Sequence, residues 1–493
     1  MTEFNNIAEI LARNARKWPN DVALVEINPQ ELENHHTTWR EYSLIESSPI
    51  AAFRSEITWA EFDEQANRFA NFLLSRGFKK GEKVAILLMN CLDWLPIYFG
   101  ILRAGCMAVP LNFRYTAEEI RYCLDLADAD ALVFGPAFVG RVEEIIDRMP
   151  RVKARLYVGD DCPSFAEPYR GRVGFCSARR PEIPIVPEDD AAIYFSSGTT
   201  GFPKAIVLQH RCLLHSCKVE QAHHGQTRDD CFLCIPPLYH TGAKMHWFGS
   251  LLAGCRSVLL MGVRPEWILR AVSEERCTIV WLLVPWAQDI LDAIERGDVK
   301  LSDYRLDQWR LMHIGAQPVP PALVRRWKAV FPHHAYDTNY GLSESTGPGA
   351  VHLGVENVDH VGAIGVAGFG WETKIVGPDG VTPVKPGEVG ESADRGLHPR
   401  EPEGEGRRRD RAARRAAGRD RGGHRLRQGG NDAGREGVQR LLPGAAALQA
   451  SAHGHLRGCS AQSDGQDREA EAAQDVRRCR PRRPAEWVGE IIE

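Results

Sequence analysis

The sequence has no long hydrophobic run, no large charge of one sign and no cysteine framework, and each absence excludes a class of protein. No apolar stretch reaches the ~18 to 20 residues that a membrane-spanning helix needs, so we expect no stable membrane insertion. Residues 1–20 have an amphipathic helical pattern without the apolar core of a signal peptide, which predicts a cytoplasmic protein. The net charge of -4 over 493 residues gives no reason to expect nucleic acid as a partner.

The 13 cysteines are odd in number and scattered, which predicts buried thiols and not a set of disulfides. Cys231 and Cys234 form one close pair, and no second pair follows at zinc spacing. Because structural zinc takes four ligands, we expect no metal at this pair.

From residue 56 helical and extended patterns alternate along the chain. Thr58 and Glu61 have the spacing of a capping box, apolar residues then recur on one helical face, and a buried strand is predicted at Val84–Leu88. Further helices are predicted at 95–104 and 117–127, and further strands at 107–110 and 131–134. This alternation predicts an α/β fold with mostly parallel sheets flanked by helices.

The stretch SSGTTGFPK, Ser196–Lys204, combines glycines, hydroxyls and a lysine directly after the apolar run 191–195. Glycines let backbone N–H groups turn toward an anion, hydroxyls add donors, and lysine adds a charge. In the P-loop of nucleotide hydrolases a helix begins at the lysine. Here Pro203 precedes Lys204, and residues 206–208 have the pattern of a returning strand, so a phosphate-binding loop of another kind is predicted.

This stretch resembles the phosphate-binding loop of the adenylate-forming enzymes, the acyl-CoA synthetase or AMP-binding superfamily. Four later segments resemble motifs of the same family in the same order. They are IPPLYHTGA at 235–243, IGAQPVPP at 314–321, NYGLSESTG at 339–347 and VGAIGVAGFGWETKIVGPDG at 361–380. Ser343 stands where threonine is usual and keeps its hydroxyl. The resemblance covers about residues 5–391 and implies a large multi-layered domain with a small β subdomain.

The resemblance implies an acid–thiol ligase that joins a carboxylate to AMP and then passes the acyl group to coenzyme A. Its implied small molecules are ATP, Mg2+, coenzyme A and a carboxylic acid, for which we expect a fatty or aromatic acid. A homodimer is left open as an alternative to a monomer.

The resemblance also implies roles for individual residues. The implied nucleotide-binding residues are Ser196, Ser197, Gly198, Thr199, Thr200, Gly201, Lys204, Gly315, Ala316, Gln317, Asn339, Tyr340, Gly341, Ser343 and Glu344. The implied catalytic residues are Lys204, Thr199, Glu344 and His240, and of these Glu344 and Thr199 would hold Mg2+. The implied substrate residues are His240, Thr241, Gly242, Lys244 and Trp247.

Two of these assignments have plainer alternatives. His240 is either at the mouth of the acyl pocket or a histidine satisfied in the core. Lys244 either pairs with an anionic group of the substrate or extends to solvent. Trp281, Trp286 and the apolar run 279–284 are expected to form a core strand.

The amino-acid composition changes at about residue 391, where the helical and alternating apolar patterns end. We therefore predict an adenylation domain at 1–390 and an aberrant Arg/Ala/Gly-rich tail at 391–493, mostly disordered because it has few apolar residues to bury. The family's small C-terminal domain carries a catalytic lysine in a Thr-x-x-Gly-Lys stretch, which is absent here.

One hypothesis explains the change. Codons permitted for Asp464–Asp475, read one nucleotide later, can spell Thr-Gly-Lys-Ile-Glu-Lys-Leu-Lys-Leu-Arg-Lys-Met, which resembles the missing motif. A single-nucleotide shift near residue 391 would then have replaced the small domain, and we expect adenylation to be impaired in the chain as written. The alternatives are an inactive ATP- or acyl-binding relative, a peptide-synthetase adenylation domain, and an Arg-rich tail that binds nucleic acid.

Overall fold

The computed structural model describes residues 4–29, 37–40, 43–46, 53–196, 203–351, 365–377, 382–384, 438–440 and 447–449. Two compact units make up the chain. The first comprises Met1–Glu372, Val438–Ala446 and Gln474–Glu493, and the second comprises Thr373–Gly437 and Ala447–Ala473. The predicted tail and its expected disorder lie outside the described residues, apart from two three-residue strands, Val438–Arg440 and Ala447–Gln449.

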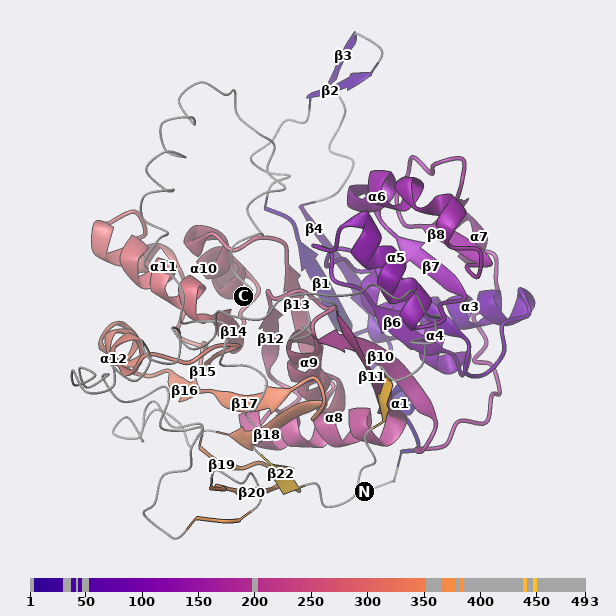
Figure 1. Ribbon diagram of the computed structural model, residues 1–493. Coiled ribbons are helices and arrows are strands. Elements are labelled where there is room, and N and C mark those ends of the chain that lie inside the picture. The colour runs from indigo at the N-terminus through magenta and orange to yellow at the C-terminus, as the bar shows by residue number, and fades with distance from the viewer. Residues whose placement is uncertain are drawn as a thin grey trace, which may run out of the picture. The chain divides into compact units, whose positions relative to one another are not determined.

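Two large sheets form the frame of the first unit (Figure 1). The first has the strand order β21 (Val438–Arg440), β11 (Lys204–Gln209), β10 (Asp190–Ser196), β6 (Met107–Pro110), β5 (Lys83–Leu87), β7 (Ala131–Phe134), β8 (Ala154–Tyr157) and β9 (Glu167–Pro168). The second has the order β16 (Ala335–Asp337), β15 (Leu311–Gly315), β14 (Ile279–Leu283), β12 (Cys231–Cys234), β13 (Arg256–Leu260), β1 (Val22–Ile27) and β4 (Arg54–Thr58). All neighbours are parallel except β10 with β11 and β1 with β4, which confirms the predicted mostly parallel architecture.

Three smaller sheets are also described. The strands β17 (Asn339–Leu342), β18 (Gly347–Val351) and β19 (Val366–Ala367) form an antiparallel sheet, the expected small β subdomain. Two pairs complete the list: β2 (Thr37–Arg40) with β3 (Ser43–Glu46), and β20 (Glu372–Lys374) with β22 (Ala447–Gln449).

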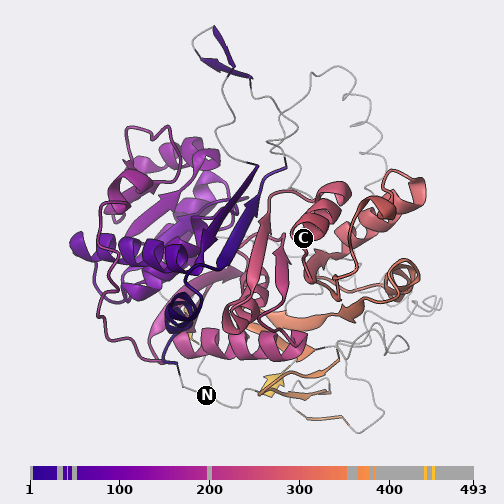
Figure 2. The same ribbon diagram turned by 180° about the vertical axis from the view of Figure 1, so that it is seen from behind.

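One layer of helices is buried between the two large sheets, and further helices cover their outer faces (Figures 1 and 2). The shared layer contains α1 (Ile7–Lys17), α3 (Trp59–Ser75), α4 (Trp94–Arg103), α8 (His210–His224) and α9 (Thr241–Ala253), with α7 (Tyr169–Val173) beside α3. The outer faces carry α5 (Ala117–Leu126) and α6 (Val139–Glu144) on the first sheet, and α10 (Pro265–Glu274), α11 (Val284–Arg296) and α12 (Pro321–Val330) on the second. Short 3-10 turns occupy Pro136–Phe138, Ile146–Arg148 and Leu301–Asp303.

Successive side chains of a strand point to opposite faces of the sheet, and this alternation produces the layers. On β5, Val84 and Ile86 join the core that faces the shared helices, whereas Ala85 and Leu87 face the outer helices. Since both faces of each sheet are covered, its central strands are apolar throughout, as strands of parallel sheets usually are.

Local signals explain where several elements begin. The capping box predicted at Thr58 and Glu61 is formed at the start of α3, and the strands predicted at 107–110 and 131–134 have the predicted bounds. The expectation that Trp286 belongs to a core strand is wrong, because it lies on α11, which begins at Val284. Pro285 cannot donate to a strand ladder but suits the first turn of a helix.

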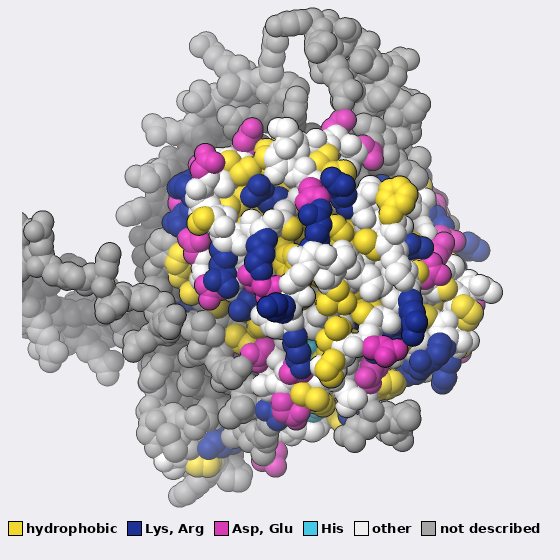
Figure 3. Space-filling view, turned by 90° about the vertical axis from the view of Figure 1, so that its right-hand side faces the viewer, with side chains coloured by type: hydrophobic (Ala, Val, Ile, Leu, Met, Phe, Trp, Pro, Cys, Tyr) yellow, Lys and Arg dark blue, Asp and Glu magenta, His cyan; other side chains and the backbone are white. Residues whose placement is uncertain are grey.

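The face of the first unit that carries α5 and α6 shows basic and acidic side chains interspersed (Figure 3). Ion pairs on α5 follow the same pattern, such as Arg121 with Asp125 at 2.6 Å. Among the described residues, this face therefore shows no patch of one sign. Among the described residues, none of the helices has the length and apolar character needed to cross a bilayer.

A buried arginine ties three helices of the shared layer together. Arg103 of α4 is 2% exposed and forms an ion pair with Asp63 of α3. Its guanidinium also donates to Asn67 Oδ1 at 2.8 Å and to the carbonyl of Ala8, in α1, at 3.2 Å. The same charge thus satisfies acceptors from two neighbouring helices.

We expect Arg103→Met to lower the free energy of unfolding by about 3 kcal/mol, because it removes the buried cation that pairs with the carboxylate of Asp63 and donates to Asn67 and Ala8. Urea denaturation followed by tryptophan fluorescence measures the change. The control is Arg121→Met on the exposed face of α5, which should leave the midpoint nearly unchanged. Equal midpoints for the two variants would contradict the role assigned to Arg103.

Candidate active site

The predicted phosphate-binding loop is bounded by two paired strands. Ser196, the last residue of β10, lies opposite Lys204, the first residue of β11, in antiparallel register. The returning strand is therefore confirmed, and no helix begins at the lysine as it would in a P-loop. Lys204 is exposed. Within the loop, Ser197, Gly198, Thr199, Thr200 and Gly201 lie outside the described residues.

The segment NYGLSESTG forms β17, the turn that follows it and the first residue of β18. Burial, followed by the charge of Glu344, raises the pKa of Tyr340, so the phenol and the carboxylate lie near one another. Thr346 has φ 61, a left-handed conformation that is costly for a β-branched residue. Such strain is stored most often at ligand-binding segments.

The segment 240–243 is in direct contact with this turn. Thr241 Oγ1 donates to Ser343 Oγ at 2.9 Å, so the start of α9 and the β17–β18 turn share a hydrogen bond. His240 caps α9, and its Nδ1 accepts the N–H of Gly242 at 3.1 Å. Burial lowers the pKa of His240, which favours the neutral ring that this cap requires. The predicted role of His240 at an acyl carboxylate stays a prediction.

The third motif follows the end of β15. Gly315 is the last residue of that strand, Ala316 adopts φ 66 and Gln317 is exposed. The neighbouring parallel strand β16 ends at Asp337, shortly before Asn339. Both segments therefore leave the sheet at its carboxyl edge, where open α/β sheets bind ligands.

Two predicted substrate residues face away from this edge, into the shared helical layer. Lys244 is 0% exposed, and its Nζ lies 4.2 Å from the ring centroids of both Tyr98 and Tyr194 and 4.8 Å from that of Trp94. The alternative that Lys244 extends to solvent is wrong. Trp247 packs against aromatic side chains of α3 and α4, and a substrate role for either residue stays a prediction.

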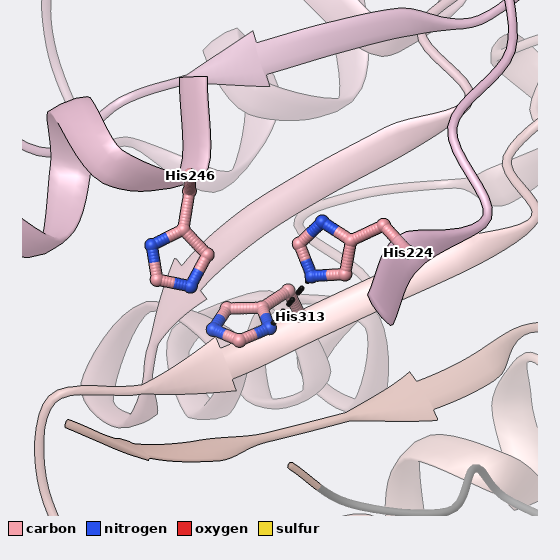
Figure 4. A group of neighbouring side chains, drawn as sticks. All are labelled: His224, His246 and His313. Carbon is pink, nitrogen blue, oxygen red and sulfur yellow. Dashed lines mark hydrogen bonds between the residues drawn. The ribbon is translucent and has the colours of Figure 1, made fainter. Parts of the chain in front are cut away.

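The opposite face of α9 carries a polar cluster that sequence reasoning missed. His224 ends α8, His246 lies on α9, His313 on β15 and Asp337 at the end of β16; we call these four residues the histidine cluster (Figure 4 shows the three histidines). The sequence signals were slight: a His-His pair before Gly225, and a histidine inside an apolar strand.

The cluster is tightly interconnected. His224 Nε2 lies 3.3 Å from His313 Nδ1 and 2.9 Å from Asp337 Oδ2, and His313 Nδ1 also contacts Asp337 Oδ2. The ring of His246 stacks on Trp281 with centroids 4.4 Å apart. Asn339, a predicted nucleotide residue, has its Nδ2 2.8 Å from His246 Nε2. The cluster thus touches one of the predicted nucleotide-binding residues directly.

Burial determines the charge states in and around this cluster. It lowers the pKa of His224 to about 4 and raises the pKa of the nearby Glu220 to about 8. Burial would also raise the pKa of Asp337, but the charges of His223 and His313 lower it well below its usual range. At neutral pH we therefore expect an ionised Asp337 beside a neutral His224.

The close cysteine pair does not form a shared site. Cys231 belongs to the core on one face of the second sheet and Cys234 to the core on the other, as alternation along β12 requires. The cysteines that the structure describes are free thiols.

A sequence profile of the family described as "AMP-binding enzyme" matches residues 11–396. The chain belongs to the AMP-binding enzyme family. The match contains every motif considered above, which confirms the resemblance. The nucleotide roles predicted for the β17–β18 turn and the end of β15, and the substrate role predicted for the start of α9, stay predictions.

Two curated relatives illustrate the similarity. A medium/long-chain-fatty-acid–CoA/3-oxocholest-4-en-26-oate–CoA ligase of Mycolicibacterium smegmatis is 27% identical over 353 residues, covering 67% of this chain and 63% of the relative. A feruloyl-CoA synthase of an Amycolatopsis species is 31% identical over 339 residues, covering 68% of this chain and 64% of the relative. The chain therefore matches less than two thirds of the length of these relatives.

Solved structures share the fold. The N-terminal domain of FACL13 from Mycobacterium tuberculosis superposes with a TM-score of 0.65 at 23% identity, covering 77% of this chain and 86% of that domain. The anthranilate CoA ligase AuaEII, in complex with anthranoyl-AMP, gives a TM-score of 0.68 at 22% identity, covering 79% and 69% of the two chains. At this identity the likeness shows the fold alone.

We expect Lys244→Met to raise the free energy of unfolding by about 1 to 3 kcal/mol. Burial lowers the pKa of Lys244 well below its usual range, and its Nζ has no hydrogen-bond partner among the described residues. Desolvating an ammonium costs several kcal/mol, more than the ~0.5 to 2 kcal/mol that a cation over an aromatic face gains. Methionine removes the polar atom and keeps the volume.

Thermal and urea unfolding measure this change. The matched control is Lys300→Met, an exposed lysine that should leave the midpoint unchanged. A destabilised Lys244→Met protein would contradict the argument and point to an unseen partner for the amine.

Proposed function

We propose that this AMP-binding enzyme activates a carboxylic acid with ATP and passes the acyl group to the thiol of coenzyme A. One observation carries the proposal: the 2.9 Å hydrogen bond between Thr241 and Ser343 joins the segment expected to face the acid to the segment expected to face the nucleotide. The two relatives support the reaction type, since both are named as acid–CoA ligases or synthases. Their names also support a fatty or aromatic acid as the substrate class.

The proposed reaction has two displacements. In the first, a carboxylate oxygen of the acid attacks the α-phosphorus of ATP and pyrophosphate leaves. In the second, the sulfur of coenzyme A attacks the acyl carbon, AMP leaves and the thiol proton passes to solvent. The loop Ser196–Lys204 would hold the β- and γ-phosphates, with fixed donors meeting the charge that develops as pyrophosphate departs.

We propose a binding site for the adenine base of the nucleotide. Tyr340, half-buried on β17, would offer its aromatic face to adenine. Gly315, Ala316 and Gln317 would line the other side with backbone, and the left-handed turn at Ala316 reverses the chain there. His240 would stand near the carboxylate of the acid.

Glu344 fits a magnesium ligand by its chemistry. Its side chain is partly exposed and forms no ion pair or hydrogen bond with any residue that the structure describes. Mg2+ prefers carboxylate and phosphate oxygens, and bound at this position it would neutralise charge on the phosphates. Thr199 is the second proposed ligand.

A second candidate is a relative that binds ATP or an acyl group without catalysis. It is favoured by one observation, the absence of a Thr-x-x-Gly-Lys lysine after residue 391 in the sequence. Nucleotide binding by calorimetry, without acid-dependent pyrophosphate exchange, would support this candidate.

We expect Glu344→Gln to lower acid-dependent ATP–pyrophosphate exchange roughly 10²- to 10³-fold, because it removes a charge that would hold the metal at the phosphates. The measurement uses the protein with its reading frame restored and a panel of fatty and aromatic acids. Glu274→Gln, an exposed residue of α10, is the control and should retain full exchange. If both variants exchange equally, Glu344 is not the proposed ligand.

We expect the chain as written to exchange pyrophosphate at least ~10²-fold more slowly than the frame-restored protein, since it has no lysine at the position expected to contact the α-phosphate. Resequencing the gene from a verified clone comes first. Comparable exchange by the two proteins would remove the hypothesis of a replaced small domain. Coenzyme A thioester formation, measured in parallel, tests the second displacement separately.

A further inference from the structure

The histidine cluster holds two nitrogens at the separation that a metal ion imposes on its ligands. His224 Nε2 and His313 Nδ1 are 3.3 Å apart. Two imidazole nitrogens bound to one tetrahedral zinc at ~2.0 to 2.1 Å lie about 3.3 to 3.4 Å from each other. A candidate ligand atom of His246 lies within 4.8 Å of those of the other two histidines.

The carboxylate of Asp337 places an oxygen beside both of these nitrogens. Its Oδ2 is 2.9 Å from His224 Nε2 and also contacts His313 Nδ1. Its other oxygen, Oδ1, lies 2.5 Å from His223 Nε2, which fixes the orientation of the carboxylate. Three nitrogens and one carboxylate oxygen form a donor set that suits zinc and similar transition metals, whereas magnesium prefers oxygen alone.

A second carboxylate points to the same position from outside the donor set. Glu220 is 0% exposed, and both of its oxygens have no hydrogen-bond partner among the described residues. Glu220 Oε2 lies 3.7 Å from His224 Nδ1, Glu220 Oε1 lies 3.7 Å from His246 Nε2, and His224 Nδ1 has no hydrogen-bond partner within the described part of the chain. A buried carboxylate behind the far nitrogen of a histidine is the usual orienting group of metal-bound imidazole.

A hydrogen-bond network without metal accounts for only part of this arrangement. Asp337 then satisfies one nitrogen each of His224 and His313, and Asn339 contacts His246 Nε2 at 2.8 Å. The oxygens of Glu220 and the Nδ1 of His224 then have no partner among the residues that the structure describes, and buried polar atoms are rarely left so in native structures. With metal on Nε2, His224 keeps its proton on Nδ1, facing Glu220.

We propose that His224, His313, Asp337 and His246 bind one divalent transition-metal ion, with zinc as the first choice, and that Glu220 orients His224. The Nδ1–H of His246 donates to the carbonyl of Gly242 at 2.6 Å, which leaves Nε2 for the metal in exchange for its contact with Asn339. The ion links α8, α9, β15 and β16, and Asn339 contacts one of its proposed ligands, His246. This site is separate from the magnesium position at Glu344 and does not depend on the proposed reaction.

Metal content and cobalt spectroscopy on the untagged full-length chain test the proposal. Protein stripped with a chelator is titrated with Co2+ alone. We expect one equivalent per chain, the visible absorption of four-coordinate cobalt, its loss on adding Zn2+, and a higher thermal midpoint with either metal. Wild-type protein that is folded by circular dichroism yet binds neither ion would overturn the proposal, whatever the variants do.

Variants then locate the ion. His313→Asn and His224→Gln should each weaken Co2+ binding more than 10²-fold, and Glu220→Gln should weaken it 10- to 100-fold while keeping the four-coordinate spectrum. The control is His210→Gln, since His210 is equally buried on α8 but outside the cluster. Unchanged binding in both ligand variants would place the metal elsewhere and also overturn the proposal.

Discussion

The two large sheets share one layer of helices, and the rest of the structure depends on the burial of that layer from both sides. All ten residues of α4 are buried, including its arginine, so the helix has no solvent face. A helix in this position has to be apolar all round, and its few polar atoms have to find partners inside. Arg103 meets that demand with acceptors from α3 and α1, and Tyr98 meets it with Tyr194 at 3.2 Å.

The helix α9 lies in the same layer, and it contacts both the buried core and the candidate active site. One of its faces carries Lys244 and Trp247 into the aromatic core. The face that carries His246 meets β14 and β15, where the ring stacks on Trp281. Its first residue, Thr241, bonds to the β17–β18 turn. The same helix therefore contacts both the aromatic core and that turn.

The order of the parallel strands explains why the segments that follow β15 and β16 lie close together. The strands β15 and β16 are adjacent and parallel, so Gly315 and Asp337 reach the same edge of the sheet. The segments that follow them, Ala316–Gln317 and Asn339–Tyr340, are therefore neighbours although the chain separates them. The histidine cluster lies at the same place and is closed off by α8 and α9, which makes its polar groups dependent on one another and on any ion they hold.

The sequence by itself determined the family and the alternation of elements. The order and spacing of the family motifs can be recognised in the sequence itself. Capping residues such as Thr58 act within one helical turn, so the start of a helix can also be predicted without coordinates. The strand predicted for the apolar run is confirmed as β14, Ile279–Leu283, but its extension to Trp286 is wrong, because strands and helices buried on all sides share an apolar pattern and only Pro285 marks the change. Only the tertiary structure decided that Lys244 is enclosed by aromatic rings and that His224, His313 and Asp337 share one point. Their meeting depends on how α8 packs on adjacent parallel strands, and no local pattern encodes contacts between segments so far apart in the chain.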